Sequence, residues 1–409
     1  MVGAGVAGLR CVQVLAEADL DVVLLERENR VGGRVKTDLK EGFLLDRGFQ
    51  VLPTAYREAR ACLDFEDLTL HRFRSGALVR LGGSFHALHH PLRHPGRIIE
   101  TARSHVGSPG DGIRLGLWVA RLLVRRAGAV WTAPEQTSAA RLGRLGFSER
   151  IVESFFRPFF GGVFLERDLE TSSRMLEFVL RSFASGPAAL PATGMEAIPR
   201  QMASGLPDGA VHTGVDVATV DSGGRGVVTR EGQRIDADAV VVAADPWTAS
   251  RLLPAIEAPV RRSVAGLYFE ADAPPLDEPL LVLNGEGTGP VNHLSVQSRV
   301  CSRYAPPGRE LISVTVLREP PGSDDELEER VRRQLRGWFG EEVRRWRLLR
   351  VDRLPAALPG TAPHEGGAGR RRVRLRRGLY VCGDHREHPS LEGALISGRR
   401  AARAALEDL

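Results

Sequence analysis

The sequence predicts an α/β protein that joins a parallel, helix-flanked sheet to a second, discontinuous domain. Three observations lead to this prediction. A glycine-rich turn opens a helical pattern near the N-terminus, an apolar run ending in an acid follows that helix, and a later apolar run ends in Gly-Asp before the last helical segment. With 409 residues, 43% of them hydrophobic and 26% charged, the chain has room for about two or three structural units.

The first unit begins with the turn Gly-Ala-Gly-Val-Ala-Gly at residues 3–8. A helical pattern follows, and then the apolar run 22–25, so the order is strand, turn, helix, strand. In such a Rossmann-like unit the glycines permit a tight turn, close approach of backbone N–H groups to a pyrophosphate, and close helix packing. The helix N-terminus attracts the anion. The unit predicts a dinucleotide site at Gly3, Gly5, Val6, Ala7 and Gly8.

The second strand ends at Glu26, 18 residues after Gly8. An acid at this place accepts hydrogen bonds from the adenosine ribose hydroxyls and repels a 2′-phosphate, which disfavours NADP. Arg27 is assigned to the same site. Because turn, helix, strand and acid follow in order, a merely structural glycine turn is the weaker interpretation.

The first strand is short, since only Met1 and Val2 precede Gly3. Strands of this kind usually have about five or six residues. We therefore expect the natural reading frame to begin several residues upstream.

A second glycine pair, Gly32-Gly33, is followed by Arg34, where backbone amides and a guanidinium can bind the pyrophosphate from another side. The segments GAGVAGL, LLERENRVGGRV and LDRGFQV together resemble the flavoprotein superfamily of flavin amine oxidases, protoporphyrinogen oxidases and phytoene desaturases. The resemblance implies bound FAD, with the segment Gly48, Phe49 and Gln50 near the isoalloxazine ring.

Two later segments extend the resemblance. Residues 192–199 are similar to the family segment that re-enters the FAD domain, and the runs 211–220, 227–229 and 239–245 are typical of hairpin strands that lead into a buried parallel strand. The resemblance implies that Val217 offers its backbone to the adenine and that Ala243 lies beside the cofactor.

The C-terminal segment contains an apolar run ending at Gly383-Asp384 and a helix that opens near Gly393-Ala394. It is similar to the last motif of the family. There Asp384 would bond the ribityl chain or pyrophosphate, and the helix start would face flavin N1 and O2, where its positive end stabilises the anionic reduced ring.

These assignments predict a Rossmann-like FAD-binding domain and an α+β substrate domain, both discontinuous. The FAD-binding domain takes residues 1–80, 190–260 and 370–409, and the substrate domain takes 81–189 and 261–369. Within the substrate domain the apolar patterns predict helices at 113–124 and 326–339 and strands at 280–283 and 311–317.

Five of the 15 phenylalanines lie between residues 155 and 164. They could be packed core, which the usual role of aromatic clusters favours, or line an apolar pocket with Arg157 at its mouth. In the second interpretation Phe155, Phe159 and Arg157 contact the substrate.

Six of the 11 histidines fall in two groups. His86, His89, His90 and His94 lie among prolines, and a loop is favoured over a metal site. His385 and His388 lie close to the expected flavin and could act as acid–base groups, with His388 in the substrate pocket, although a solvated loop is favoured. No catalytic residue is assigned.

Composition limits the partners. The net charge of +5 comes from 56 basic and 51 acidic residues, and only Lys36 and Lys40 are lysines. The arginine run 370–377 is interpreted as a solvated hairpin rather than a nucleic-acid site, because no aromatic residue interleaves it. Four scattered cysteines indicate neither disulfides nor a metal site, so we expect non-covalent FAD and a cytoplasmic protein, with peripheral membrane contact left open.

The leading hypothesis is a flavoenzyme that removes a hydride from an apolar small molecule, isoprenoid- or porphyrin-like, and passes the electrons to oxygen, a quinone or another acceptor. The resemblance implies a lysine near flavin N5 in amine oxidases, and none follows Lys40. Two alternatives stay open: a non-catalytic prenyl- or lipid-binding protein of the same fold, and an NAD-linked dehydrogenase.

Overall fold

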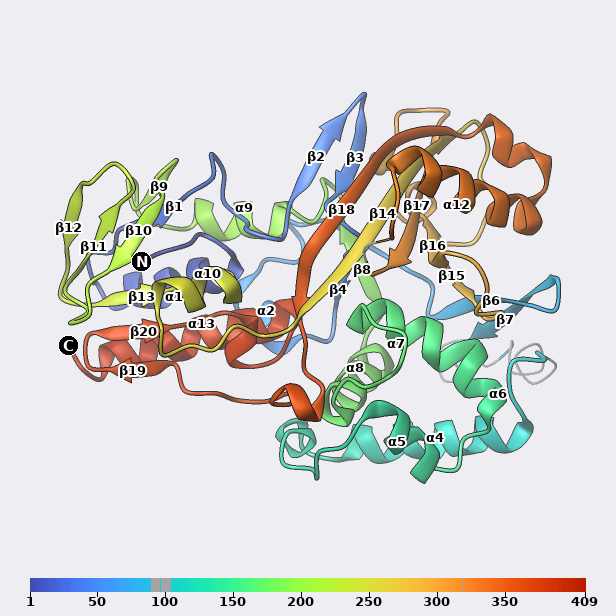
Figure 1. Ribbon diagram of the computed structural model, residues 1–409, viewed down its shortest axis with the longest axis horizontal. Coiled ribbons are helices and arrows are strands. Elements are labelled where there is room, and N and C mark those ends of the chain that lie inside the picture. Colours follow the sequence, from blue (N-terminus) through green and yellow to red (C-terminus); the bar gives the residue numbers. More distant parts are fainter. Residues whose placement is uncertain (90–95, 97–103, 319) are drawn as a thin grey trace.

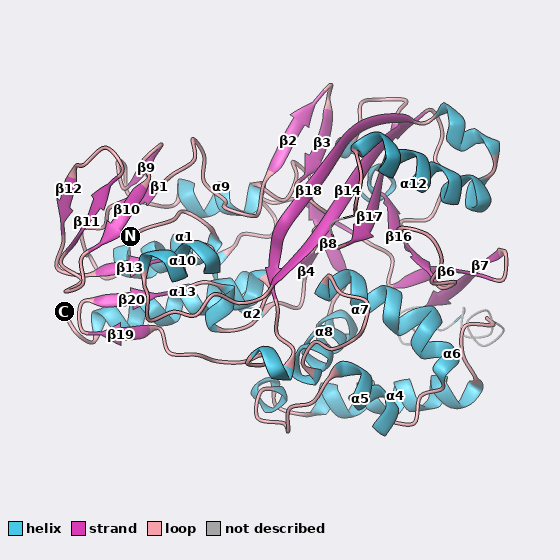
Figure 2. Ribbon diagram, in the orientation of Figure 1, coloured by secondary structure: helices cyan, strands magenta, loops and turns pink. Residues whose placement is uncertain are grey.

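The computed structural model describes residues 1–89, 96, 104–318 and 320–409. Figure 1 shows two lobes side by side along the longest axis. The first lobe contains both chain ends and a parallel sheet with helices, whereas the second contains a large sheet and a group of helices (Figures 1 and 2). The predicted α/β class is confirmed. The predicted domain limits stay a prediction.

The sheet of the first lobe, which is parallel except for one edge strand, is built from segments that are far apart in the sequence. Val2 forms parallel bridges to Leu25 on one side and to Val242 on the other, so it lies between β1 and β13. Its N–H donates to the carbonyl of Val241 at 2.9 Å. The strands, in spatial order, are β9 (Val211–Thr213), β1 (Leu24–Glu26), Val2, β13 (Val240–Val242), β20 (Leu379–Val381) and β19 (Arg374–Arg376).

Helices α1 (Val6–Ala16) and α13 (Leu391–Leu406) pack on each other with their backbones in contact. A Cβ added at Gly398 of α13 would lie 2.1 Å from the carbonyl oxygen of Ala7 in α1, so only glycine fits there. This contact brings the first and last helices of the chain together.

Smaller sheets complete the first lobe and its border. The run 211–220 is not a simple hairpin strand, because β9 pairs parallel with β1 and only its second half joins an antiparallel sheet. The elements between the two lobes include the hairpin β2–β3, and the residues that follow this hairpin line a cavity. These elements are β2 (Thr37–Lys40), β3 (Phe43–Asp46), β4 (Leu52–Pro53), α2 (Arg57–Cys62), β5 (Leu70–Arg72), β8 (Ala188–Pro191), α9 (Ala197–Ser204), β10 (Val217–Val220), β11 (Gly226–Thr229), β12 (Arg234–Asp236) and α10 (Pro246–Leu252).

The second lobe is built on a seven-stranded sheet with the order β18-β14-β17-β16-β15-β6-β7. Apolar side chains of α12 pack on it, and the predicted strands at 280–283 and 311–317 and the predicted helix at 326–339 are confirmed. The elements are β6 (Gly76–Leu81), β7 (Ser84–His89), β14 (Arg261–Ala271), β15 (Leu281–Asn284), β16 (Val291–Val296), α11 (Gln297–Val300), β17 (Glu310–Leu317), α12 (Asp324–Phe339) and β18 (Arg347–Pro359).

A group of helices lies beside this sheet and includes the helix predicted at 113–124 (Figure 2). The phenylalanine cluster occupies one continuous helical stretch that contains a π-helical turn, Val152–Phe156. Such turns interrupt the regular spacing of side chains and are frequent at functional sites. The helices are α4 (Pro109–Val124), α5 (Ser138–Arg144), α6 (Glu149–Ile151), α7 (Arg157–Phe164) and α8 (Ser173–Ser185).

Of two local predictions, one is confirmed and one is wrong for the residues that the structure describes. The arginine-rich hairpin is confirmed, since β19 and β20 pair antiparallel. The loop predicted around the first histidine group is wrong for His86 and His89, which lie in β7; His90 and His94 fall outside the described residues. The residues that the structure describes contain no group of side chains arranged to hold a metal ion, and no helix among them is long and apolar enough to cross a bilayer.

The α1–α13 contact yields the first testable prediction. Gly398→Ala is expected to lower the free energy of unfolding by about 1–3 kcal/mol, because its Cβ would meet backbone atoms that cannot move independently. Gly337→Ala in α12 is the matched control: nothing lies within 4 Å of its added Cβ, so it should raise stability by about 0.5–1 kcal/mol. Urea unfolding of both variants checks this, and equal stabilisation by the two would contradict it.

Candidate functional site

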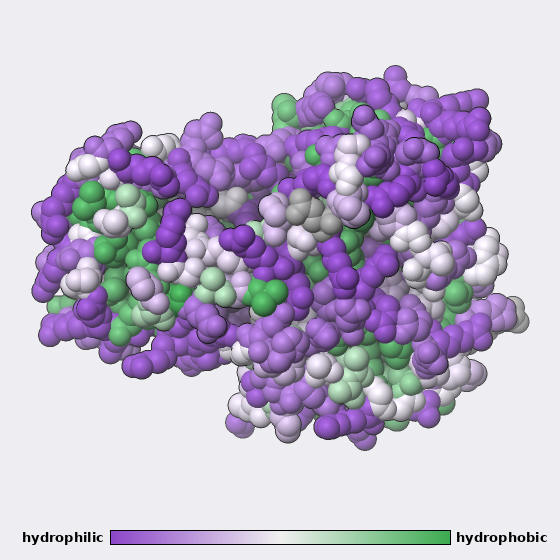
Figure 3. All heavy atoms as spheres, in the orientation of Figure 1, coloured by the Kyte–Doolittle hydropathy of each residue, from purple (hydrophilic) through white to green (hydrophobic). Residues whose placement is uncertain are grey.

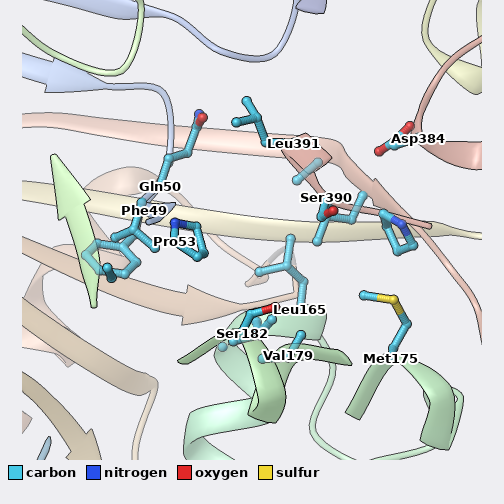
Figure 4. Close-up of a pocket in the computed structure, with 18 of the residues that line it drawn as sticks. Phe49, Gln50, Pro53, Leu165, Met175, Val179, Ser182, Asp384, Ser390 and Leu391 are labelled. Carbon is cyan, nitrogen blue, oxygen red and sulfur yellow. The ribbon is translucent and has the colours of Figure 1, made fainter. Parts of the chain in front are cut away.

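One cavity of about 1980 Å³ extends between the two lobes and is lined by residues of both. Ordinary ligand pockets measure roughly 300–1,000 Å³. This cavity therefore has room for a large cofactor and a second molecule. Figure 4 shows part of its lining, with Asp384 and Ser390 on one side and Leu165, Val179 and Met175 on another.

The N-terminal glycine turn forms one end of the cavity. Gly3 has a φ of 101°, and a Cβ there would lie 2.9 Å from the carbonyl oxygen of Ala243. A Cβ at Gly8 would lie 2.1 Å from the carbonyl oxygen of Gly3, which explains why the helix needs glycine at this point. Gly5 differs, because nothing lies within 4 Å of its added Cβ. Its missing side chain leaves open space at the start of α1.

The N-terminus of α1 is open to this space. Gly5, Val6 and Ala7 line the cavity, the helix has no side-chain cap, and its first turn contains no acidic residue. The first N–H groups of a helix have no partner within the helix and carry its positive dipole end. This arrangement fits the pyrophosphate of a dinucleotide.

Glu26 lies beside the turn and is 8% exposed. Its carboxylate accepts hydrogen bonds from the N–H groups of Ala4, at 2.8 Å, and Glu28, at 2.9 Å. These bonds fix its position at the cavity wall, and each carboxylate oxygen keeps a lone pair for a ribose hydroxyl. Exposed Arg27 also lines the cavity.

The second glycine pair lies directly against the first turn. Gly32 and Gly33 both have positive φ, and a Cβ at Gly33 would lie 3.3 Å from the Cα of Gly5. The Arg34 guanidinium that follows is 2.7 Å from the Asp384 carboxylate and donates to the carbonyl of Ala357 at 2.9 Å. The pair thus joins the N-terminal and C-terminal motifs at the cavity.

The start of α13 forms another side of the cavity. Ser390 caps the helix by accepting a hydrogen bond from the N–H of Gly393 at 3.0 Å, and Ser390, Leu391 and Ala394 line the cavity. A Cβ at Gly393 would lie 2.0 Å from the carbonyl oxygen of His388, so glycine is needed for packing there. The cavity therefore receives the N-termini of both α1 and α13.

Asp46 fixes the segment that leads to Gly48. Its buried carboxylate accepts hydrogen bonds from the Thr37 hydroxyl at 2.5 Å, the Met195 N–H at 3.0 Å and the Tyr304 hydroxyl at 3.0 Å. Burial raises the pKa of Asp46 to about 6, although these hydrogen bonds oppose the shift. The network ties β2, β3 and the segment before α9 to the second lobe.

Residues 48–50 then pass into the cavity. Gly48 has a φ of 78°, and Gln50 donates hydrogen bonds to the carbonyls of Arg34, at 3.0 Å, and Arg47, at 2.9 Å. The Phe49 ring lies edge-on to the ring of His293, with centroids 5.0 Å apart. This segment joins the charged end of the cavity to its apolar end.

Most of the predicted cofactor residues line this one cavity. The exceptions are Gly8 and Gly393, which serve packing instead. The lining set comprises Gly3, Gly5, Val6, Ala7, Glu26, Arg27, Gly32, Gly33, Arg34, Gly48, Phe49, Gln50, Val217, Ala243, Gly383, Asp384 and Ala394.

Only some of the residues predicted to contact the substrate line the cavity. Phe155 and Phe159 line the cavity, whereas Phe156 and Phe164 of the same cluster are buried core. Arg157 is not among the described residues that line the cavity, because its guanidinium pairs with Glu153 at 2.6 Å. Both interpretations of the cluster thus apply to different members, and Arg157 is corrected to a surface ion pair.

His388 also does not line the cavity in the described part of the chain. Its ring stacks on Trp131, with centroids 4.6 Å apart, and its Nδ1 lies 2.9 Å from the Ser390 hydroxyl. Burial lowers the pKa of His388 to about 3 and that of neighbouring His385 to about 4. The solvated loop expected here is therefore wrong, and His388 supports the helix start rather than contacting substrate.

His293, which no sequence pattern indicated, lies in β16 and lines the cavity. The Asn292 amide donates to the Pro158 carbonyl at 2.9 Å and lies 3.0 Å from Nδ1 of His293. Nδ1 therefore accepts and Nε2 carries the hydrogen. Burial lowers the pKa of His293 to about 3, so the ring is neutral. A lone histidine in an apolar strand gives no sequence signal of this role.

Comparison with known proteins decides the family. Residues 6–406 match the family of flavin-containing amine oxidoreductases. The chain belongs to this family. It is thus an FAD-dependent oxidoreductase, and the predicted superfamily is confirmed. The NAD-linked alternative is set aside, because the whole chain, including the C-terminal motif, fits the flavin family.

The individual relatives either match only a short part of the chain or share little sequence identity with it. L-amino-acid oxidase from Crotalus adamanteus is 44% identical over 73 residues, which cover 18% of this chain and 14% of the oxidase. An oxidoreductase from Methanosarcina mazei superposes with a TM-score of 0.73 at 18% identity, covering 99% of both chains. A putrescine oxidase bound to putrescine superposes with a TM-score of 0.71 at 16% identity, covering 99% of this chain and 98% of that one. These structures show the shared fold.

The residues present fit FAD. The open space at Gly5, the uncapped N-terminus of α1 and the fixed carboxylate of Glu26 match a dinucleotide, and the start of α13 matches the flavin end. All four cysteines are described, and none lines the cavity, so none of them is placed to form a thioether bond to the cofactor.

Gly5→Ala separates folding from cofactor binding. Gly5 has a φ of −72°, which alanine adopts freely, and its added Cβ meets no atom, so the unfolding free energy should change by about 1 kcal/mol or less. The same Cβ enters the space that fits the pyrophosphate, so we expect FAD affinity to fall at least about ten-fold. Flavin titration and thermal unfolding measure the two effects, and unchanged affinity would contradict the assignment.

The pKa of Asp46 gives a prediction with a definite sign. Because this pKa is higher in the folded protein, Asp46 favours folding below pH 3.8, and that contribution is lost as the pH rises through about 6. The loss is about 3 kcal/mol. We expect Asp46→Asn to remove this part of the pH dependence of unfolding between pH 4 and pH 7. Asp38→Asn is the control, since the pKa of Asp38 is about 2; matching profiles for the two variants would contradict the prediction.

Proposed function

We propose that this oxidoreductase removes a hydride from a neutral, apolar small molecule, isoprenoid- or porphyrin-like in character. The electrons then pass to oxygen, a quinone or another acceptor. The observation that carries the proposal is the separation of charge along the cavity. Every carboxylate on its described lining comes from the first lobe: Glu26, Glu28, Asp216, Asp245 and Asp384.

The second lobe offers an apolar wall. Phe155 and Phe159 stack with centroids 5.6 Å apart, and Phe183 of α8 meets Phe159 edge-on at 5.4 Å. Val179 and Leu180 of α8 extend the same wall. Burial of apolar surface is the main source of affinity that such a wall provides.

An ammonium substrate finds no counter-ion there. Among the described lining residues of the second lobe none carries a carboxylate, and desolvating an unpaired cation is costly. Neither lysine lines the cavity: Lys36 is buried in an ion pair with Glu28, and Lys40 donates to the carbonyl of Leu349 at 2.5 Å. These features favour a neutral substrate over an amine such as the putrescine named for one structural relative.

The apolar half also contains polar side chains, among them Ser182, Thr315 and His293. His293 is neutral and its Nε2–H has no hydrogen-bond partner among the described residues. It suits an uncharged hydrogen-bond acceptor on the substrate.

Different residues of the chain would bind the cofactor, stabilise its charge and orient the substrate. Bound FAD supplies the hydride-accepting chemistry. The start of α1 and Arg34 would hold the phosphates, and the N-terminus of α13 would supply positive potential where negative charge develops on reduction. The phenylalanine wall orients the substrate and excludes water.

Anaerobic bleaching of the flavin tests the proposal. Neutral isoprenoids and porphyrinogens should bleach it, and protonated amines of similar size should do so at least about ten-fold more slowly. Phe159→Ala should raise the half-saturating substrate concentration about ten-fold, because it removes apolar contact area, with bound flavin unchanged. Phe65→Ala, outside the cavity lining, is the matched control.

The results of the bleaching experiments distinguish the candidate functions. Faster bleaching by amines would contradict the proposed substrate class. A flavin that no substrate bleaches, in a protein that still binds apolar molecules, would favour the non-catalytic binding protein.

A further inference from the structure

The outward face of α4 is apolar. Ile113 is 67% exposed, Leu117 58% and Val124 86%. With Ala120 they recur at intervals of three and four residues, so they form one stripe along the helix, called here the α4 stripe. Apolar surface is visible among the helices of the second lobe in Figure 3, on a face that is mostly hydrophilic.

The opposite face of α4 is apolar as well. Trp118 is 4% exposed and Leu122 1%, and both pack into the helical core with Phe147. A surface helix of a water-soluble protein normally has one apolar face and one polar face. Because packing already uses the inner face, the outer stripe needs a separate explanation.

The α4 stripe borders the cavity. Ile113, Ala120 and Val124 of the stripe line it, together with Gly116 between them. These side chains are exposed to solvent and also face the cavity, so α4 forms part of its rim. An apolar molecule that enters along α4 therefore meets the apolar side chains of the stripe first.

Positive charge flanks the stripe. Arg114, Arg121, Arg125 and Arg126 are all exposed. Arg114 lies 3.8 Å from the buried carboxylate of Asp111, and Arg125 lies 3.8 Å from Glu177. Arg121 and Arg126 have no ion-pair partner among the described residues, so their charge stays available at the surface. Apolar side chains flanked by arginines are typical of helices that lie in the interface of an anionic bilayer.

We propose that α4 docks on an anionic membrane surface and that the apolar substrate reaches the cavity along it from the lipid. The entry route rests on the proposed function, whereas the docking rests on the stripe and its charges. A second copy of the chain is a poorer occupant, because a symmetric contact would bring the four arginines of each copy close together.

Vesicle binding tests the docking. The FAD-loaded protein should sediment with phosphatidylglycerol-containing vesicles. Replacing the stripe by Ile113→Ser, Leu117→Ser and Val124→Ser together should weaken binding at least about ten-fold. The control variant Leu39→Ser with Val260→Ser changes exposed apolar residues elsewhere, at 73% and 48% exposure, and should bind within about two-fold of the parent.

The charge is tested separately. Arg121→Glu with Arg126→Glu should lose about ten-fold in affinity for phosphatidylglycerol vesicles. The flavin spectrum and thermal unfolding of each variant, expected to match the parent, show that the fold is intact.

Three results would overturn the docking proposal: no vesicle binding by the parent, equal binding by the stripe variant, or a dimer that the stripe variant abolishes while vesicle binding persists. Vesicle binding requires no turnover. Binding without flavin bleaching by detergent-dispersed substrates would therefore reject the proposed function and leave the docking intact.

Discussion

The architecture depends on the close contact between the first and last helices of the chain. At Gly398 the backbone of α13 comes so near the carbonyl of Ala7 in α1 that a Cβ has no room. Because the helices touch there, both N-termini reach the same cavity, and both bring positive potential to it. The Arg34–Asp384 pair joins the motifs that precede these helices. A cofactor with a negatively charged pyrophosphate between its two ends fits between them.

Burial and charge differ between the two ends of the cavity. This difference indicates which end fits FAD and which end fits the substrate. Carboxylates and glycine turns from the first lobe surround the end that fits FAD, whereas phenylalanines and aliphatic side chains surround the other. Between them, burial keeps His293 neutral, and Asp46 anchors the connecting segment through three hydrogen bonds. The chemistry of the site therefore belongs to the flavin, while the protein contributes position, field and exclusion of water.

The sequence predicted what local backbone geometry dictates. The glycines at 3, 32 and 48 all have positive φ in the structure, and their motifs converge on one cavity. It could not predict side-chain direction: Arg157 and Phe159 are two residues apart, yet one pairs with Glu153 and the other lines the cavity. His388 and His293 show the same limit, because only tertiary packing decides that the first is covered by Trp131 and the second lines the cavity. The sequence likewise did not predict that one apolar face of α4 is exposed, because an apolar helix pattern does not indicate which side is buried.

We infer that one cavity holds FAD at its glycine-lined end and leaves the phenylalanine-lined end for substrate. A crystal structure of the flavin-loaded protein would test this inference. We expect the pyrophosphate at the N-terminus of α1, within hydrogen-bond distance of the backbone at Gly5–Ala7, and the isoalloxazine ring between the start of α13 and Phe49. A flavin whose phosphates lie away from α1, or whose ring fills the space beside Phe155 and Phe159, would contradict it.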